Sequence, residues 1–157
     1  MNEAVFLFVE NNEPSYCPIC GELLLPRSRR PRKLIDNDGN QIVYYIRRLR
    51  CAPCNRIHHE LPDRIVPYKR HCAETIENIT HEKTNDTPCE EKTVKRIFRW
   101  WNAIHPYFLN ILKSLTMKYK NEYHSPPVFK EIIRAAVNSN NWIFVDSVCT
   151  RSACMSG

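Results

Sequence analysis

Two pairs of closely spaced cysteines constrain the fold of this chain more than any other feature. The pairs have the form C-x-x-C, and 30 residues (21–50) lie between them. The four cysteines are Cys17, Cys20, Cys51 and Cys54. Four thiolates delivered as two close pairs form a closed tetrahedral shell for Zn²⁺. The chain between the pairs must double back, and the turn-forming sequence DNDG at 36–39 indicates a β-hairpin there. We therefore predict a zinc ribbon holding one structural zinc ion.

Two other interpretations of the cysteine pairs are open, namely two disulfides or a redox C-x-x-C motif. A redox site needs only one pair, next to a βαβ pattern that this sequence does not show. His58 and His59 follow the second pair closely and could replace one thiolate. We favour a supporting, stacking or surface role for both histidines.

The remaining cysteines bear on the compartment. No N-terminal segment has the basic start and long apolar stretch of a signal peptide, and no run approaches the ~18 apolar residues of a membrane span. Reduced thiols in a cytoplasmic protein fit this pattern better than a secreted disulfide scaffold. We expect Cys72, Cys89, Cys149 and Cys154 to be buried or free thiols.

Charge is unevenly distributed along the chain. Residues 1–70 hold 12 Lys/Arg and 8 Asp/Glu (+4), residues 71–91 hold 1 and 6 (−5), and residues 92–157 hold 10 and 3 (+7). Two basic blocks that flank an acidic one suit a polyanionic partner contacted at two places, although a basic balance alone often serves only solubility.

Within the ribbon, the segment 41–49 (QIVYYIRRL) is rich in β-branched and aromatic residues and is predicted to be a strand. The segment 23–35 before it contains Pro26 and Pro31, which favour an irregular edge strand or an arm. Its cations could contact a phosphate backbone, or the hairpin could simply be solvated. These cations are Arg27, Arg29, Arg30, Arg32 and Lys33, with Arg47, Arg48 and Arg50 on the neighbouring strand.

From about residue 70 the apolar spacing becomes helical. Cys72, Ile76 and Ile79 form one apolar stripe, and Ile132, Ile133 and Ala136 are expected to face inward on the last helix. Helices are predicted at about 70–81, 88–104, 106–122 and 127–138, the second with a capping box formed by Thr87 and Glu90. This second helix has an apolar stripe (Val94, Ile97, Phe98, Trp101) and, roughly 160° away, a cationic stripe (Lys92, Lys95, Arg96, Arg99).

The helices at 70–81 and 88–104 resemble the two helices of a helix-turn-helix motif, with the cationic stripe on DNA. A solvated amphipathic helix is the alternative. The connection of about six to eight residues is longer than the usual three or four, which counts against the motif.

Together these patterns predict an α+β protein, a small N-terminal β zinc ribbon followed by an all-α helix-turn-helix bundle. The predicted boundaries are 1–69 for an initial strand and the ribbon, 70–146 for the helical domain and 147–157 for a tail. We identify no catalytic residues, because no glycine-rich phosphate loop, nucleophile elbow or catalytic carboxylate spacing is present.

Several longer motifs resemble a known family. They are C-P-x-C-G at 17–21, I-R-R-L-R-C at 46–51, R-x-H-H-E-L-P-D at 56–63, P-Y-K-R at 67–70 and K-T-V-K-R-I-F-R-W-W at 92–101. They are similar to an uncharacterised family of small bacterial proteins, chiefly from Firmicutes, with a zinc ribbon followed by a helix-turn-helix, and to the N-terminal part of insertion-sequence transposases. The resemblance implies DNA binding by analogy of fold only, over roughly residues 15–145.

The sequence thus predicts a cytoplasmic, non-catalytic protein that binds double-stranded DNA and is associated with a mobile element, as an end- or target-binding accessory or a transcription regulator. A protein–protein adaptor with a structural zinc, acting on a transposase or another protein, is the first alternative. A fragment of a transposase or nuclease is the second. The oligomeric state and the DNA site are not predicted.

Overall fold

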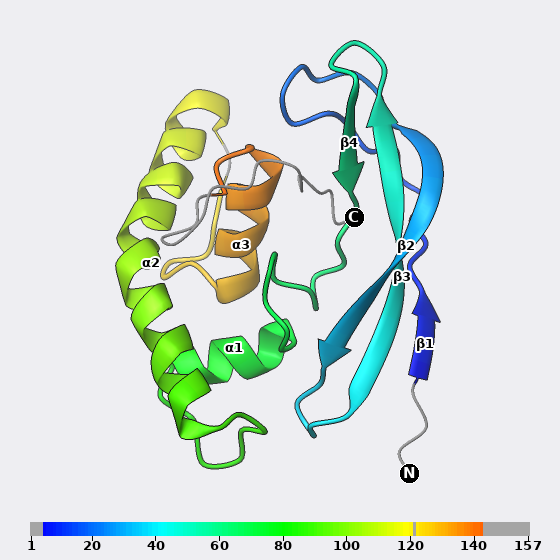
Figure 1. The fold of residues 1–157 in the computed structure, drawn as a ribbon. Coiled ribbons are helices and arrows are strands. Elements are labelled where there is room, and N and C mark those ends of the chain that lie inside the picture. The colour runs from blue at the N-terminus through cyan, green and yellow to red at the C-terminus, as the bar shows by residue number, and fades with distance from the viewer. Residues whose placement is uncertain (1–4, 121, 143–157) are drawn as a thin grey trace.

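The computed structural model describes residues 5–120 and 122–142, and it consists of one sheet with three helices on one side of it (Figure 1). The strands are β1 (Val5–Phe8), β2 (Leu25–Ile35), β3 (Gln41–Cys51) and β4 (Arg56–His59). The helices are α1 (Ala73–Thr80), α2 (Glu91–Tyr119) and α3 (Phe129–Asn138). The α+β class is therefore confirmed.

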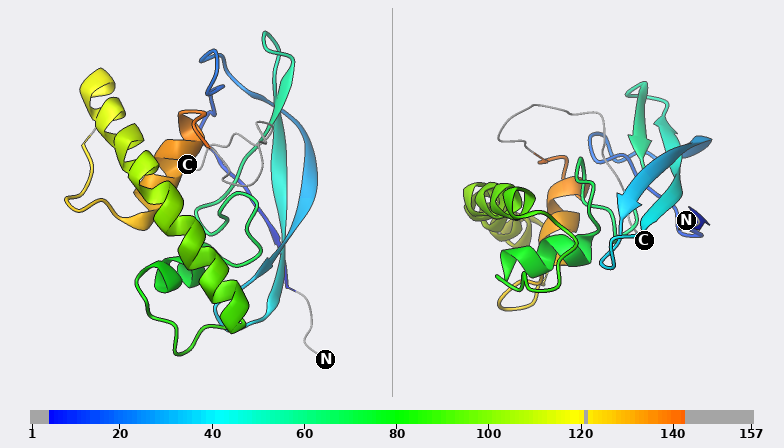
Figure 2. Two further views of the ribbon diagram at one scale, coloured as in Figure 1. Left: turned by 60° about the vertical axis from the view of Figure 1, so that its left-hand side comes forward. Right: turned by 60° about the horizontal axis from the view of Figure 1, so that its bottom comes forward.

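Strand β3 is the centre of the sheet. On one side β2 pairs with it antiparallel over almost its whole length. On the other side β1 pairs in parallel with the first half of β3, and β4 pairs antiparallel with the second half. The predicted strand at 41–49 is thus confirmed, and Figure 2 shows the sheet from two further sides. Most residues of β3 are buried or half-buried, which explains why the strand lies at the centre of the sheet.

Strand β2 lies at an edge of the sheet, as its prolines require. A proline has no N–H to donate to a neighbouring strand, so it is tolerated where one side of a strand is open. The pairing shifts register between Pro26 and Ser28, and Pro31 lies opposite Tyr45. Of the two predictions for this segment, the irregular edge strand is the one confirmed.

The turn between β2 and β3 is stabilised by its own side chains. Asp36 Oδ1 accepts hydrogen bonds from the amides of Asp38 and Asn40, at 3.0 and 2.7 Å. Gly39 has a φ of +86°, a conformation that residues with a side chain rarely adopt. A Cβ atom at this position would also approach Pro88 to 3.3 Å, so the turn lies against the segment before α2.

The long helix α2 differs from the prediction. The sequence predicts two helices, 88–104 and 106–122, but α2 runs without a break from Glu91 to Tyr119 with Pro106 inside it. Pro106 is exposed, and the buried stripe continues past it through Ile104 and Phe108. The apolar burial of both halves outweighs the loss of one backbone hydrogen bond, which explains why the helix continues.

The predicted capping box at Thr87 and Glu90 is also wrong. Helix α2 begins three residues after Pro88, its N-cap is Glu90, and no side chain caps it. Thr87 Oγ1 instead accepts a 3.4 Å hydrogen bond from the amide of Cys89. The threonine therefore stabilises the loop before the helix.

A contiguous core lies between the sheet and the helices. The predicted stripe of Cys72, Ile76 and Ile79 on α1 is fully buried in it, together with Leu34 and Ile46 of the sheet. The predicted stripe of α2 is buried at Ile97 and Trp101 and half-buried at Val94 and Phe98. The inward residues expected on the last helix, Ile132, Ile133 and Ala136, are buried as well.

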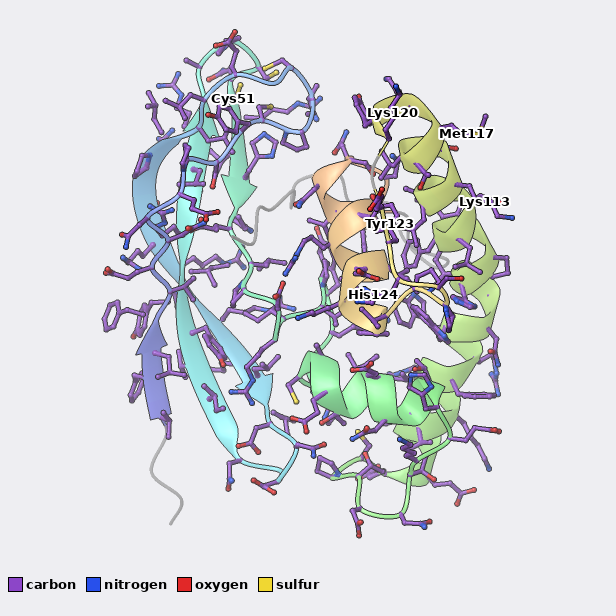
Figure 3. All side chains as sticks on the ribbon, turned by 180° about the vertical axis from the view of Figure 1, so that it is seen from behind. Cys51, Lys113, Met117, Lys120, Tyr123 and His124 are labelled. Atoms are coloured by element: carbon purple, nitrogen blue, oxygen red, sulfur yellow. The ribbon has the colours of Figure 1, made fainter. Side chains whose placement is uncertain are left out.

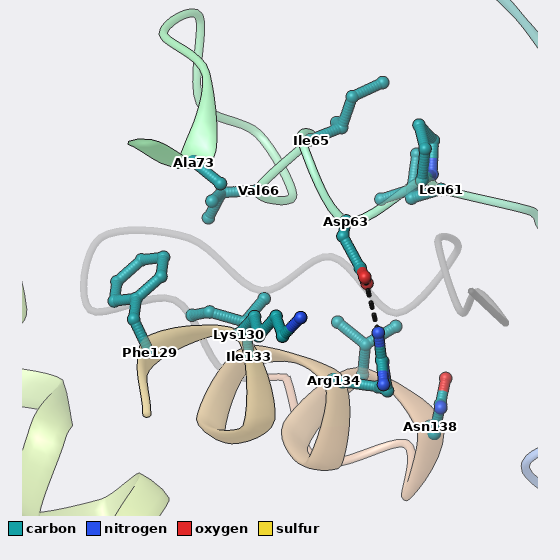
Figure 4. Close-up of a pocket in the computed structure, with 12 residues that line it drawn as sticks. Leu61, Asp63, Ile65, Val66, Ala73, Phe129, Lys130, Ile133, Arg134 and Asn138 are labelled. Atoms are coloured by element: carbon teal, nitrogen blue, oxygen red, sulfur yellow. Dashed lines mark hydrogen bonds and ion pairs between the residues drawn. The ribbon is translucent and has the colours of Figure 1, made fainter. Parts of the chain in front are cut away.

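The segment between β4 and α1 connects the sheet to α3. Leu61, Ile65 and Val66 pack opposite Phe129 and Ile133, and the carboxylate of Asp63 forms a 2.5 Å ion pair with Arg134 (Figure 4). The segment, which includes Pro62 and Pro67, is therefore a well-packed connection.

The predicted all-α helix-turn-helix bundle is not confirmed. The connection between α1 and α2 spans residues 81–90, longer than the six to eight residues expected and far longer than the turn of that motif. The domain boundaries remain predictions, and the tail at 147–157 lies outside the described residues. Trp142, the last described residue, packs on Phe108 with ring centroids 5.2 Å apart.

Candidate metal centre and cationic surfaces

The first cysteine pair lies on a tight backbone turn. The amide of Gly21 donates to the carbonyl of Cys17 at 2.8 Å, and the amide of Cys17 donates to the carbonyl of Glu22 at 2.8 Å. Gly21 has a φ of +78°, where glycine is favoured. This turn directs both sulfurs of the pair to one side.

The second pair lies on the turn between β3 and β4. Cys51 is the last residue of β3 and is completely buried, and Cys54 is half-buried in the turn. Asn55, at a φ of +52°, donates its amide to the carbonyl of Ala52 at 3.3 Å. Asparagine tolerates this left-handed conformation better than most residues, which explains its presence here.

The four sulfurs converge. The Sγ atoms of Cys17, Cys20, Cys51 and Cys54 all lie within 4.8 Å of one another, and those of Cys20 and Cys51 are 3.4 Å apart. Four sulfurs at ~2.3 Å from one tetrahedral ion would be about 3.8 Å apart. The observed spacing brackets this value, so the four cysteines could bind a metal ion. All four are free thiols here, and none is joined in a disulfide.

The electrostatics of the cluster favour a cation. The pKa of Cys20 is lowered, first by a backbone hydrogen bond at Glu22 and then by Cys51. The pKa of Cys54 is raised to about 12, first by its hydrogen bond with Cys20 and then by burial. One thiolate thus suppresses ionisation of its neighbour, and a bound cation would allow all four to ionise together.

His58 is buried beside the cluster but outside the set of converging sulfurs. Its Nε2 atom lies 3.5 Å from the sulfur of Cys17, and burial, followed by the charge of Arg56, lowers its pKa. A neutral imidazole can donate an N–H to a thiolate and so stabilise its charge. This geometry agrees with the supporting role favoured from the sequence.

The four-cysteine cluster lies at one end of the sheet, where Figure 3 labels Cys51. A groove of about 920 Å³ separates the first cysteine turn from the ends of α2 and α3. Its lining includes Pro18 and Ile19 on one side and Lys118, Tyr119 and Asn138 on the other.

A buried ion pair fastens the chain before the first cysteine to the sheet. Glu60 is 2% exposed, and its carboxylate accepts from Arg47 Nε at 2.5 Å and Arg47 Nη2 at 2.9 Å. The same carboxylate accepts from Asn11 at 3.1 Å and Ser15 at 3.4 Å. The sequence prediction missed Glu60, because a single glutamate in E-L-P-D shows no pattern that indicates its partners.

The cationic stripe of α2 is exposed as predicted, at Lys92, Lys95, Arg96 and Arg99. Lys95 forms a 2.5 Å ion pair with Glu91 one turn earlier, and both side chains are largely exposed. Helix α2 packs its apolar side against α1 and α3, so its cationic stripe lies on the opposite face of the helix. Figure 3 also shows Lys113 and Met117 on the outer side of this helix.

The predicted cationic arm does not form one surface, because side chains alternate along a strand. Arg29 and Lys33 belong to one face of β2, and Arg30 and Arg32 to the other. Arg29 is engaged already, since it bonds Glu10 at 3.2 Å and the carbonyl of Val9 at 2.8 Å. Arg27 is exposed, within the register shift.

The chain is an α+β protein with a four-cysteine centre that could bind a metal and with several exposed cationic groups. The chain belongs to the DUF6431 family, a domain of unknown function, which matches residues 17–98. The matched segment includes all four cysteines and the sheet from the first cysteine turn onward. No curated protein and no solved structure matches this chain. Among the described residues, no helix is long and apolar enough to cross a membrane.

Proposed function

We propose that this protein is a zinc-containing, non-catalytic DNA-binding protein. The observation that supports zinc is the convergence of four sulfur ligands and no carboxylate. Soft thiolates in a tetrahedral set select zinc over hard cations such as Mg²⁺ or Ca²⁺. Four protein ligands leave no open position for water, so the ion would have a structural role.

The DNA part of the proposal depends on the exposed cations of α2. Three of them, Lys92, Arg96 and Arg99, lie on one side of the helix without a carboxylate partner among the described ion pairs. An α-helix fits the major groove of DNA, where lysine and arginine contact phosphates and arginine pairs with guanine. The proposal needs an exposed basic helix but does not need the short turn of a helix-turn-helix.

The proposed biological setting is a mobile element. The resemblance to transposase N-terminal segments supports a role at the ends or the target of a mobile element, or in transcription regulation. We infer no catalytic step, since the proposed zinc ion is fully ligated by protein. A cytoplasmic location and duplex DNA as partner belong to the same proposal.

The test compares duplex binding by the zinc-loaded wild type and a variant with Lys92, Lys95, Arg96 and Arg99 all changed to alanine. Binding is measured at two salt concentrations. Removing one cation that touches a phosphate should reduce the salt slope by about one, so the quadruple variant should bind more weakly and with a flatter salt dependence. Circular dichroism and zinc content should be unchanged, because these side chains are exposed.

The control variant removes the same charge elsewhere on the helical part. Its substitutions are Lys113→Ala, Lys118→Ala, Lys120→Ala and Lys130→Ala, all at exposed positions. If both quadruple variants lose equal affinity, net charge and not the α2 surface explains the binding. If the α2 variant binds as tightly as the wild type, the DNA proposal is wrong.

A protein–protein adaptor is the second candidate, and one observation favours it. All four residues of β1 are apolar and exposed: Val5 51%, Phe6 58%, Leu7 39% and Phe8 63%. Exposed apolar edge strands often contact other chains. Pull-down of a transposase or another protein that requires Phe6 and Phe8, together with absence of duplex binding, would favour this alternative.

A further inference from the structure

Three arginines and a histidine project from the helix-facing side of the sheet. Arg30 and Arg32 alternate along β2 on this side, as the pairing of Arg30 with Ile46 and Arg32 with Tyr44 shows. Arg48 of β3 lies opposite Ser28 on one side and opposite His59 of β4 on the other. Three neighbouring strands therefore bring these four side chains onto one face.

Three of these side chains surround a small hollow. Arg30, Arg32 and His59 line a space of about 30 Å³, with Ile46 and Tyr68 among its other walls. A water-sized atom needs only about 10–15 Å³ of such space. The hollow therefore accommodates one or two oxygen atoms of an anion, while the rest of the anion faces solvent.

The donors near the hollow are partly held in place. Arg32 Nη2 donates to the carbonyl of Lys69 at 3.1 Å, and Arg48 Nη1 donates to Ser28 Oγ at 3.4 Å. Arg48 Nε is buried and has no hydrogen-bond partner among the described residues. Arg30 is exposed. This part of the sheet thus combines one exposed arginine, Arg30, with two arginines, Arg32 and Arg48, that hydrogen bonds hold in position.

The charge at this place is of one sign. Burial, followed by the charges of Arg30, Arg48 and Arg32, lowers the pKa of His59 to about 4. On the other face of the sheet, Arg29 and Arg47 are paired with Glu10 and Glu60. Among the described residues no ion pair includes Arg30 or Arg48. Carboxylates of the described residues therefore neutralise Arg29 and Arg47 but do not neutralise Arg30 and Arg48.

We propose that Arg30 and His59 form a phosphate-binding site, with Arg32 and Arg48 contributing to its positive potential. Guanidinium groups bind phosphate oxygens with paired, charge-assisted hydrogen bonds, and a neutral imidazole donates one N–H. The phosphate belongs either to a nucleic-acid backbone or to a phosphorylated small molecule. The site depends on the proposed function only for the first of these sources.

The first experiment titrates inorganic phosphate into the zinc-loaded full chain and follows the His59 ring signals by NMR. Phosphate should shift them in the wild type, and Arg30→Gln should weaken binding by about tenfold or more, since hydrogen bonds to charged groups are the strong ones. Arg29→Gln is the matched control, one residue away on the opposite face, and should bind phosphate like the wild type. Because Arg30 is exposed on an edge strand, its variant should keep the fold.

Two outcomes overturn the site: unchanged His59 signals at saturating phosphate, or equal loss of binding in the Arg29 and Arg30 variants. The second experiment identifies the source by measuring duplex DNA binding of Arg30→Gln. Weaker DNA binding supports the site and assigns it to the backbone. The other outcome keeps the phosphate effect, while DNA binding is either absent in the wild type or unaffected by Arg30→Gln. This outcome supports the site and assigns it to a phosphorylated small molecule. The proposed DNA function and the phosphate site can therefore fail separately.

Discussion

Arg47 offers the sharpest test of how the ribbon is held together. It lies on β3, and its guanidinium makes two hydrogen bonds to the buried carboxylate of Glu60. Arg47→Met keeps most of the aliphatic length of the side chain but removes both bonds. The glutamate would then retain only its contacts to Asn11 and Ser15.

The expected loss follows from burial. Glu60 is 2% exposed and the side chain of Arg47 18% exposed, so removing the arginine leaves a charge that water cannot reach easily. Such a change costs about 3–5 kcal/mol when a pair is fully buried. The partial exposure of Arg47 places the expected loss near ~3 kcal/mol, at the lower end of that range. Glu60→Gln in the same chain removes the stranded charge, so the double variant should be more stable than the sum of the single losses by about 2 kcal/mol.

Urea unfolding of the zinc-loaded protein, followed by circular dichroism, measures these free energies. The control is Arg29→Met, whose position pairs directly with Arg47 across the two strands. Its ion pair with Glu10 is exposed, at 33% and 76%, and such pairs contribute about 1 kcal/mol or less. If Arg47→Met destabilises the protein no more than Arg29→Met does, burial does not govern the strength of this pair and the reasoning is wrong.

Three further predictions concern the metal, the long helix and pH. Cys51→Ser should abolish stoichiometric zinc binding and unfold the ribbon end of the sheet, because metal binding supplies much of the folding energy of such sites; full zinc content by metal analysis would contradict this. Pro106→Ala should raise the free energy of unfolding by ~1–3 kcal/mol, since alanine restores a backbone donor inside α2; unchanged or lower stability in urea would mean that the helix does not continue through this position. His59 has a folded pKa of about 4 against an ordinary value of 6.5, so the unfolded state takes up its proton first and stability falls as pH drops below 6.5. His59→Gln should make the stability profile flatter between pH 6.5 and about 5 than that of the wild type, and parallel profiles would refute the shift.

Several patterns that the structure bears out depend only on residues close together in the chain. The spacing within each C-x-x-C pair and the DNDG turn between them depend on a few neighbouring residues, and the four sulfurs converge as expected. The stripe of Cys72, Ile76 and Ile79 depends only on the helical period, and all three residues are fully buried. The β-branched and aromatic composition of 41–49 likewise marks the central strand.

Tertiary packing decided what local patterns could not. Pro106 is a helix breaker by its local chemistry, yet the core on both sides of it keeps α2 continuous. Thr87 has the sequence context of a cap, but the loop against Gly39 places the helix start later. The basic arm is a single cluster in sequence, but once paired with β3 it becomes a strand whose alternating side chains divide its arginines between two faces. An arginine of β2 or β3 contacts Glu60, Glu10 or the small hollow according to which distant segment packs beside it. These contacts form only when segments that are separate in the sequence come together in the fold.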